Sequence, residues 1–203
     1  MAHKSSCGLI LLAAGASTRM GRPKQLLPVH GKPLLRQVVE SALTAPVSPV
    51  VVVLGANSAE IASCLDGLAV QIVVNAGWTE GMGSSLREGM KMLTALAPAV
   101  QGVVVALADQ PDFPAAHIGS LIETQRTTGR SIVASECAGV RGPPVLFTAG
   151  HFPALLALRG DAGARSLLKS HAHEVVAVPF PAARDLDTPA DYAAYVKGSS
   201  DIP

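Results

Sequence analysis

The chain has 203 residues, of which 49% are hydrophobic and 15% are charged, and its formal net charge is +1. This length suits a single domain with a large apolar core, and the balanced charge argues against a surface that binds duplex nucleic acid. The three cysteines, Cys7, Cys64 and Cys137, stand far apart, which argues against a zinc site or a disulfide framework and is typical of a reducing compartment.

Neither a secretory signal nor a membrane span is expected. The first apolar run, residues 9–14, leads directly into a glycine-containing loop with arginine and lysine, unlike the cleavage region of a signal peptide. The chain contains no stretch of the roughly 20 apolar residues that a membrane helix needs. We therefore expect a cytoplasmic protein that has no membrane partner.

Apolar runs alternate with helical patterns along the chain. In chain order, strands are predicted at residues 7–13, 50–55, 70–74, 102–107, 131–134, 145–147 and 174–178, and helices at residues 33–43, 58–65, 84–96, 117–125, 154–158, 164–170 and 189–196. Because the strands are continuously apolar, they indicate a parallel sheet that is covered on both faces. We expect one doubly wound α/β domain over residues 1–203, with its ligands beyond the carboxyl ends of the strands.

The loop that follows the first predicted strand, residues 14–24, has the composition of an anion site. Gly15 and its small neighbours let backbone N–H groups approach a ligand closely, and Arg19 and Lys24 add positive charge. The loop matches neither the Walker A motif nor G-x-G-x-x-G. The same residues could form a surface loop whose cations are solvated, but we favour the interpretation that the loop binds phosphate.

A second glycine-rich segment, residues 75–85, follows the third predicted strand. Gly81 and Gly83 give the backbone freedom there, and Ser84 or Ser85 is expected to cap the next helix. The free N–H groups of that helix would suit an anion. An ordinary capped helix explains the same residues equally well.

Aspartates stand at the end of the fourth strand and near the last helix. Asp109 follows a valine-rich strand, where a carboxylate is costly unless it is paired or bound to a cation, and Mg²⁺ favours one or two carboxylates together with substrate phosphates. Asp112 fits a helix N-cap instead. Asp185 and Asp187 precede a helix start at residues 188–191, and we place them on opposite faces of the incoming strand. We therefore expect at most one of them to face Asp109.

Together these segments resemble the MobA-like nucleotidyltransferase family, and within it the molybdenum cofactor cytidylyltransferase branch. Residues 12–24 match the opening signature of the family, LAxGxSxRMGxxK, and further matches lie at residues 77–89, 107–111, 141–147, 160–165 and 185–192. The resemblance implies a Rossmann-like fold of the nucleotide-diphospho-sugar transferase (GT-A-like) type. It also implies a nucleotide-binding half at about residues 7–136 and a substrate side with the final helix at about residues 137–203.

The resemblance implies that CTP and molybdopterin react to give molybdopterin cytosine dinucleotide and pyrophosphate, with Mg²⁺ as cofactor. Its implied catalytic residues are Arg19, Lys24 and Asp109, and its implied metal ligands are Asp109 and Asp187. The nucleotide would lie against Leu12, Ala13, Ala14, Gly15, Ala16, Ser17, Arg19, Lys24, Gly55 and Asp109. The acceptor would lie against Gly81, Met82, Gly83, Ser84, Ser85, Gln110 and Pro111. A molybdenum hydroxylase apoenzyme is the macromolecular partner that the resemblance suggests.

Three other functions fit the same residues. One is a related nucleotidyltransferase with a different base, such as GTP, or a different acceptor, such as a sugar phosphate. Another is a non-catalytic protein that holds nucleotide or cofactor during the maturation of molybdenum hydroxylases. The third is an enzyme on the same scaffold that reduces a small aromatic dye with a nicotinamide cofactor.

Overall fold

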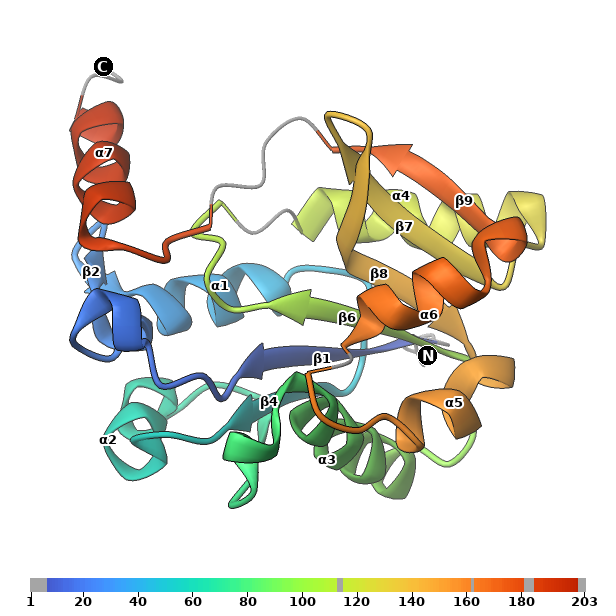
Figure 1. The fold of residues 1–203 in the computed structure, drawn as a ribbon, viewed down its shortest axis with the longest axis horizontal. Helices are drawn as coiled ribbons and strands as arrows, with labels where there is room; N and C mark the ends of the chain where they lie inside the picture. Colours follow the sequence, from blue (N-terminus) through green and yellow to red (C-terminus); the bar gives the residue numbers. More distant parts are fainter. Residues whose placement is uncertain (1–6, 113–114, 162, 181–184, 201–203) are drawn as a thin grey trace.

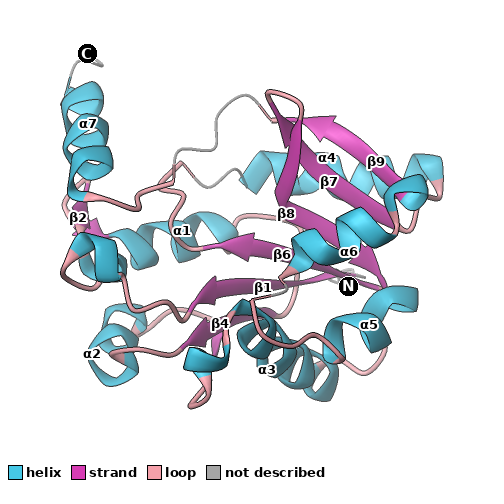
Figure 2. Cartoon of the chain, viewed as in Figure 1, coloured by secondary structure: helices cyan, strands magenta, loops and turns pink. Residues whose placement is uncertain are grey.

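The computed structural model describes residues 7–112, 115–161, 163–180 and 185–200. Residues 1–6, where no secretory signal is expected, lie outside these ranges. Strands from both halves of the chain join one central sheet, and helices lie on both of its faces (Figures 1 and 2). No helix among the described residues is long and apolar enough to cross a membrane.

The central sheet has seven strands in the order β5-β4-β1-β6-β8-β7-β9. Their bounds are β1 (Cys7–Ala13), β4 (Val50–Leu54), β5 (Gln71–Val74), β6 (Gly102–Leu107), β7 (Ile132–Cys137), β8 (Val140–Thr148) and β9 (Val175–Pro179). All neighbours are parallel except at β8, which runs antiparallel to both β6 and β7. The expected sheet, doubly wound and mostly parallel, is confirmed.

The antiparallel strand β8 arises from a tight hairpin with β7. Ala138 and Gly139 connect the two strands, and both have positive φ values of 49° and 78°, as two-residue hairpin turns require. The predicted strands at residues 131–134 and 145–147 are therefore too short, because the paired strands continue through polar residues to this turn. A second, small hairpin joins β2 (Pro28–Val29) and β3 (Lys32–Pro33).

Helices divide the apolar core into two layers, one on each face of the sheet. On one face lie α1 (Leu34–Ala42), α2 (Ser58–Ala62), α4 (Ala115–Thr128) and α7 (Pro189–Ser200), and on the other lie α3 (Met82–Leu96), α5 (Phe152–Leu156) and α6 (Ala164–Ser170). Alternate residues of β1 serve the two layers: Leu9 and Leu11 pack into the first, Ile10 and Leu12 into the second. A strand buried on both faces in this way accounts for its continuous apolar sequence.

Gly89 sets how closely α3 approaches the sheet. A Cβ atom at Gly89 would lie 2.8 Å from Cγ2 of Ile10 and 2.9 Å from Cγ2 of Val53, whereas one at Gly119 of α4 would meet only Pro46, at 3.9 Å. A Gly→Ala change raises the helix propensity of α3 and α4 by a similar amount. The difference in the free energy of unfolding between the two variants therefore reports the effect of packing alone. We expect Gly89→Ala to be less stable than Gly119→Ala by about 1–3 kcal/mol in urea unfolding. Equal stability would show that α3 can shift to make room.

Candidate nucleotide-binding site

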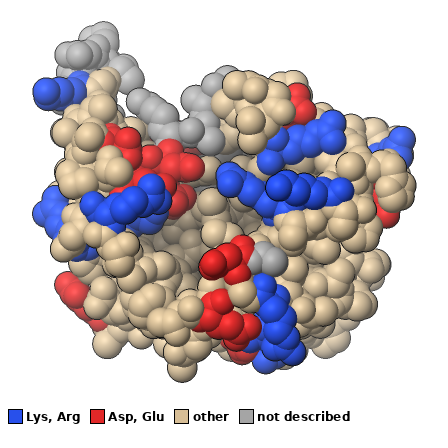
Figure 3. Space-filling view, in the orientation of Figure 1, with Lys and Arg blue, Asp and Glu red and all other residues tan. Residues whose placement is uncertain are grey.

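A cavity of about 670 Å³ lies beyond the carboxyl ends of β1 and β6. Its wall combines the loop after β1, the end of β6, the junction of η4 (Trp78–Glu80) with α3, the start of α6 and the segment before α7. In the space-filling view, acidic and basic side chains lie directly beside one another on the rim between this hollow and α7 (Figure 3). Segments that are far apart in the sequence therefore share one charged site.

The loop after β1 is held in shape by Gln25, which is only 2% exposed. Its Nε2 donates hydrogen bonds to the carbonyl oxygens of Ala13 and Gly15, at 2.8 and 3.1 Å, and its Oε1 accepts one from Ser17 at 3.3 Å. The Ser17 hydroxyl also accepts from the backbone N–H of Lys24, at 3.1 Å. The role of Gln25 could not be predicted from the sequence, because one amide in an apolar segment carries no signal of it.

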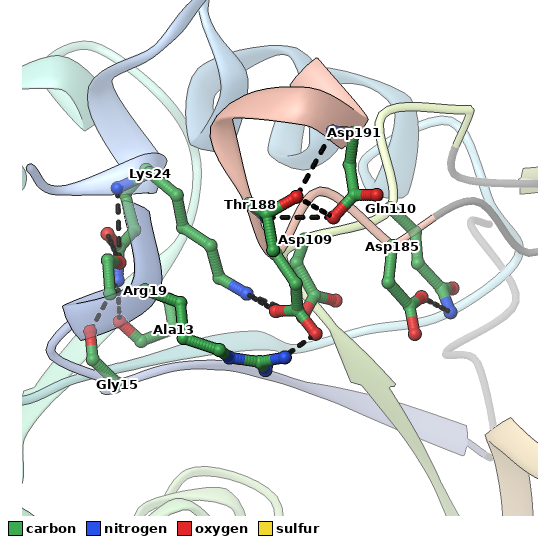
Figure 4. Close-up of polar contacts among 12 residues, drawn as sticks. Ala13, Gly15, Arg19, Lys24, Asp109, Gln110, Asp185, Thr188 and Asp191 are labelled. Carbon is green, nitrogen blue, oxygen red and sulfur yellow. Dashed lines mark hydrogen bonds and ion pairs between the residues drawn. The ribbon is translucent and has the colours of Figure 1, made fainter. Parts of the chain in front are cut away.

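Lys24, in η2 (Lys24–Leu26), bridges two carboxylates from distant parts of the chain. Its Nζ lies 2.8 Å from Oδ2 of Asp109 and 2.8 Å from Oδ1 of Asp187, and Arg19 donates to the other oxygen of Asp187, Oδ2, at 2.8 Å. In Figure 4, Lys24 and Arg19 reach from the first loop toward Asp109. Both oxygens of Asp187 and one oxygen of Asp109 are therefore paired with cations.

These contacts shift the pKa values of Lys24 and Asp187. Burial lowers the pKa of Lys24, but the charge of Asp109 and the hydrogen bonds to Asp109 and Asp187 outweigh burial and raise it above the usual lysine value. The hydrogen bond from Lys24 holds the pKa of Asp187 below its ordinary value. Burial raises the pKa of Asp185, despite a hydrogen bond from Gln110. At neutral pH Lys24 is thus a fixed positive charge beside the ionised carboxylate of Asp187.

Asp185 and Asp187 both line the cavity, so the expectation that at most one of them faces Asp109 is wrong. Residues two apart on an extended chain point to the same face, so Asp185 and Asp187 can both reach the cavity while Leu186 between them packs into the core. The segment before α7 is held by Leu186, which is 1% exposed and whose backbone N–H donates to the carbonyl oxygen of Asp109 at 2.9 Å. The expected helix start is confirmed by reciprocal hydrogen bonds between Thr188 and Asp191.

In the second glycine-rich segment, the helix is present but has no serine cap at its start, unlike the prediction. Helix α3 begins at Met82, and Ser84 lies inside its first turn, where its hydroxyl donates to the carbonyl oxygen of Gly81 at 2.8 Å. The backbone N–H of Gly83 donates to the carbonyl oxygen of Gly160, at 2.9 Å. Neither serine caps the helix, because a loop from the second half of the chain already covers its start.

The structure brings together only part of the predicted site. Eleven predicted residues line the cavity: Leu12, Ala13, Ala14, Gly15, Arg19, Lys24, Gly81, Met82, Ser85, Asp109 and Asp187. Seven lie outside its lining: Ala16, Ser17, Gly55, Gly83, Ser84, Gln110 and Pro111. Gly55 instead allows close packing, since a Cβ there would lie 2.6 Å from the carbonyl oxygen of Ala14. The lining also includes residues that the sequence analysis did not assign to a site, among them Trp78, Asp161, Arg165 and Asp185.

The charged side chains of the lining are balanced in a way that fits a divalent cation. Three are cations (Arg19, Lys24 and Arg165) and four are carboxylates (Asp109, Asp161, Asp185 and Asp187), so this lining alone would not attract a triphosphate. Oδ1 of Asp109 is buried and has no hydrogen-bond partner within the described part of the chain, which fits an oxygen that would bind a cation. Among the described residues, no three His, Cys, Asp or Glu side chains could hold a metal ion together. Such an ion would therefore take its remaining ligands from substrate and water.

Comparison with known proteins decides the family. The family model of the MobA-like NTP transferase domain matches residues 9–175, which are most of the chain. The chain belongs to the MobA-like NTP transferase family. Nicotine blue oxidoreductase from Paenarthrobacter nicotinovorans is 38% identical to this MobA-like protein over 167 residues, which are 79% of this chain and 80% of that protein. The family resemblance seen in the sequence is thereby confirmed.

Two solved structures from mycobacteria have a similar fold. A homologue of Mycobacterium tuberculosis Rv0371c from Mycobacterium sp. strain JC1 is 32% identical, with a TM-score of 0.84 over 97% of this chain and 98% of that one. A manganese complex of Rv0371c from Mycobacterium tuberculosis H37Rv is 28% identical, with a TM-score of 0.78 over 94% of this chain and 98% of that one. The fold of this MobA-like protein is therefore the Rossmann-like fold expected from its sequence.

Proposed function

We propose that this protein transfers CMP from CTP to molybdopterin, releasing pyrophosphate and forming molybdopterin cytosine dinucleotide. The observation that carries the proposal is the bridge of Lys24 between Asp109 and Asp187, at the cavity and beside the Gly15 loop. Membership of the MobA-like family supports nucleotidyl transfer. The choice of CTP and of the pterin acceptor is supported by the sequence resemblance to the cytidylyltransferase branch.

The chain's own residues would act by position and charge. The acceptor phosphate is already an ionised nucleophile, so an in-line displacement needs no activated serine or cysteine. Within the described part of the chain, the backbone N–H groups of Gly15, Ala16 and Ser17 donate no hydrogen bond, which leaves them for the β- and γ-phosphates of CTP. Lys24 and Arg19 would neutralise the charge that builds up on the departing pyrophosphate.

A divalent cation fits this site. Asp109 and Asp187 would hold Mg²⁺ together with substrate phosphate oxygens, and the unpartnered Oδ1 of Asp109 supports this assignment. When bound, such an ion polarises phosphate oxygens and stabilises negative charge. The manganese bound to Rv0371c supports a divalent cation in a relative of this chain.

The acceptor would occupy the side of the cavity formed by Gly81, Met82 and Ser85, which Pro143 and the start of α6 complete. Gly83 and Ser84 would support this side from the first turn of α3. Gln110 and Pro111 would support the acceptor from the end of β6, where Gln110 donates to Asp185. We propose that residues 1–203 act as one domain, with the nucleotide side in about residues 7–136 and the acceptor side in about residues 137–203. The product would pass to a molybdenum hydroxylase apoenzyme in the cytoplasm, where the three free cysteines would stay reduced.

Gly15 offers a test of the backbone cradle. A Cβ at Gly15 would meet no protein atom within 4 Å, and the same holds for Gly150 in η5 (Ala149–His151). We expect Gly15→Ala to leave the free energy of unfolding unchanged and to weaken CTP binding about tenfold, which is about 1.4 kcal/mol, in calorimetric titration. The matched variant Gly150→Ala should change neither. If Gly15→Ala binds CTP as tightly as the wild type does, the phosphates do not bind at this loop.

The proposed reaction is tested by pyrophosphate release. The purified protein, molybdopterin and Mg²⁺ are incubated with CTP, GTP, ATP or UTP, and the pterin product is identified by mass spectrometry. We expect release with CTP that depends on molybdopterin and stops in EDTA. Pyrophosphate release with GTP but not with CTP would show that GTP is the nucleotide substrate. Release with another phosphorylated acceptor but not with molybdopterin would show that molybdopterin is not the acceptor. Specific binding of CTP without release would favour a non-catalytic carrier.

The likeness to nicotine blue oxidoreductase makes a second candidate, the reduction of an aromatic dye by a nicotinamide cofactor. The absence of G-x-G-x-x-G after β1 counts against it. Nicotine blue and NADH or NADPH are added in place of CTP and molybdopterin, and absorbance at the nicotinamide band is followed. Dye-dependent oxidation together with no pyrophosphate release would establish this candidate instead.

A further inference from the structure

The two carboxylates proposed to hold a divalent cation are already occupied by the protein's own cations. Asp187 has no free oxygen, because Lys24 Nζ lies 2.8 Å from its Oδ1 and Arg19 lies 2.8 Å from its Oδ2. Asp109 shares its Oδ2 with Lys24, also at 2.8 Å, and only its buried Oδ1 is unpartnered. A metal ion that binds both residues must therefore displace at least one of these cations or avoid the oxygens that they hold.

Lys24 is the stronger of the two competitors. Its side chain is 17% exposed and contacts both carboxylates, whereas the side chain of Arg19 is 69% exposed and contacts one. An ion pair as exposed as that of Arg19 is screened by solvent and contributes little, so it yields readily to another ion. The less solvated contacts of Lys24 are screened less by water and salt.

The ammonium group of Lys24 lies where a metal ion that bridges Asp109 and Asp187 would bind. Its Nζ lies at equal distances from one oxygen of each carboxylate. A Mg²⁺ ion binds carboxylate oxygens at about 2.0–2.1 Å, so it would compete for the same two oxygens, and its double charge would repel the ammonium group at such short range.

We propose that Lys24 is a built-in counter-ion that fills the divalent-cation site between Asp109 and Asp187 until a nucleotide arrives. This inference rests on the proposed function. A triphosphate beside the Gly15 loop gives Lys24 another anion to pair with, which releases the two carboxylates for the metal ion. Metal and nucleotide then raise each other's affinity, since coupling between two binding sites is reciprocal.

The test is Mn²⁺ binding to the nucleotide-free protein, followed by the loss of the free-ion signal in electron paramagnetic resonance. We expect Lys24→Met to bind Mn²⁺ at least about tenfold more tightly than the wild type, because it removes one positive charge next to the ion. Arg19→Met should change the affinity little. The matched control Lys32→Met breaks a lysine–carboxylate pair with Glu40 that lies on the exposed surface, and should have no effect. Saturating CTP should tighten Mn²⁺ binding in the wild type more than in Lys24→Met.

Unchanged or weaker Mn²⁺ binding by Lys24→Met would overturn the inference. A larger gain in Arg19→Met than in Lys24→Met would also overturn it, because the ion would then use Oδ2 of Asp187 and leave Lys24 in place. If Lys24→Met unfolds, Lys24→Gln takes its place, and the rise in Tm on adding Mn²⁺ should exceed that of the wild type. Failure of the proposed metal site itself has a different signature: no variant binds Mn²⁺, with or without CTP.

Discussion

Lys24→Ala should lower kcat for nucleotidyl transfer by about 10²–10³-fold, the usual loss when one group that stabilises transition-state charge is removed. The lysine lies between two carboxylates beside the Gly15 loop, where it can reach the leaving pyrophosphate. The same variant should bind Mn²⁺ more tightly while it turns over more slowly. That combination separates a role in charge stabilisation from simple loss of the metal. The measurement is single-turnover pyrophosphate release at saturating CTP and Mg²⁺.

Stability has to be measured in parallel for Lys24→Ala. Because the lysine is largely buried, its loss should cost an amount between that of an exposed ion pair, about 0–1 kcal/mol, and that of a fully buried one, about 3–5 kcal/mol. Lys32→Ala, which removes an exposed pair with Glu40, is the control for both assays. Wild-type turnover per folded molecule of Lys24→Ala, at whatever stability, would contradict its role at the phosphates.

Asp109→Asn should abolish the effect of Mg²⁺ on CTP binding. The change is nearly isosteric, and the carbonyl oxygen of Asp109, which accepts from the backbone N–H of Leu186, stays in place, so the fold should survive. In thermal unfolding, a wild-type protein at 100 times its Kd for CTP gains about 2.7 kcal/mol. We expect this gain to require Mg²⁺ in the wild type and to be small in Asp109→Asn, whether or not Mg²⁺ is added.

A matched substitution separates the loss of a metal ligand from the general effect of removing one negative charge. Asp66→Asn removes a carboxylate on the exposed surface and should behave as the wild type does. Equal turnover of the wild type in EDTA and in Mg²⁺ would reject the metal assignment for Asp109. A Mg²⁺ effect that persists in Asp109→Asn and disappears in Asp185→Asn would move the ion to Asp185.

Two of the strands that are buried on both faces could be predicted from the sequence with their correct ends. The runs at residues 7–13 and 102–107 correspond to β1 and β6, because two apolar layers leave no position for a polar residue. The hairpin of β7 and β8 was missed because its outer part includes Glu136 and Arg141, whose pairing depends on the partner strand and on the positive φ of Ala138 and Gly139. Local sequence does not report such pairing.

The site could be predicted where one loop carries it, and not where distant segments meet. Ala14, Gly15, Arg19 and Lys24 of the first loop line the cavity as expected, whereas Ala16 and Ser17 do not. The capping role of Ser84 was wrong because Gly160, 76 positions further along the chain, covers the start of α3. Asp185 was left out of the predicted site because opposite faces were assigned to two residues that an extended chain puts on the same face, with Leu186 between them turned into the core.

A crystal structure of the protein with CTP and Mg²⁺ tests the central claim most directly. The account predicts the triphosphate against the backbone of Gly15, Ala16 and Ser17, the metal ion between Asp109 and Asp187, and Lys24 turned from the carboxylates to the phosphates. An empty first loop, with the triphosphate bound elsewhere and Lys24 still bridging Asp109 and Asp187, would contradict it.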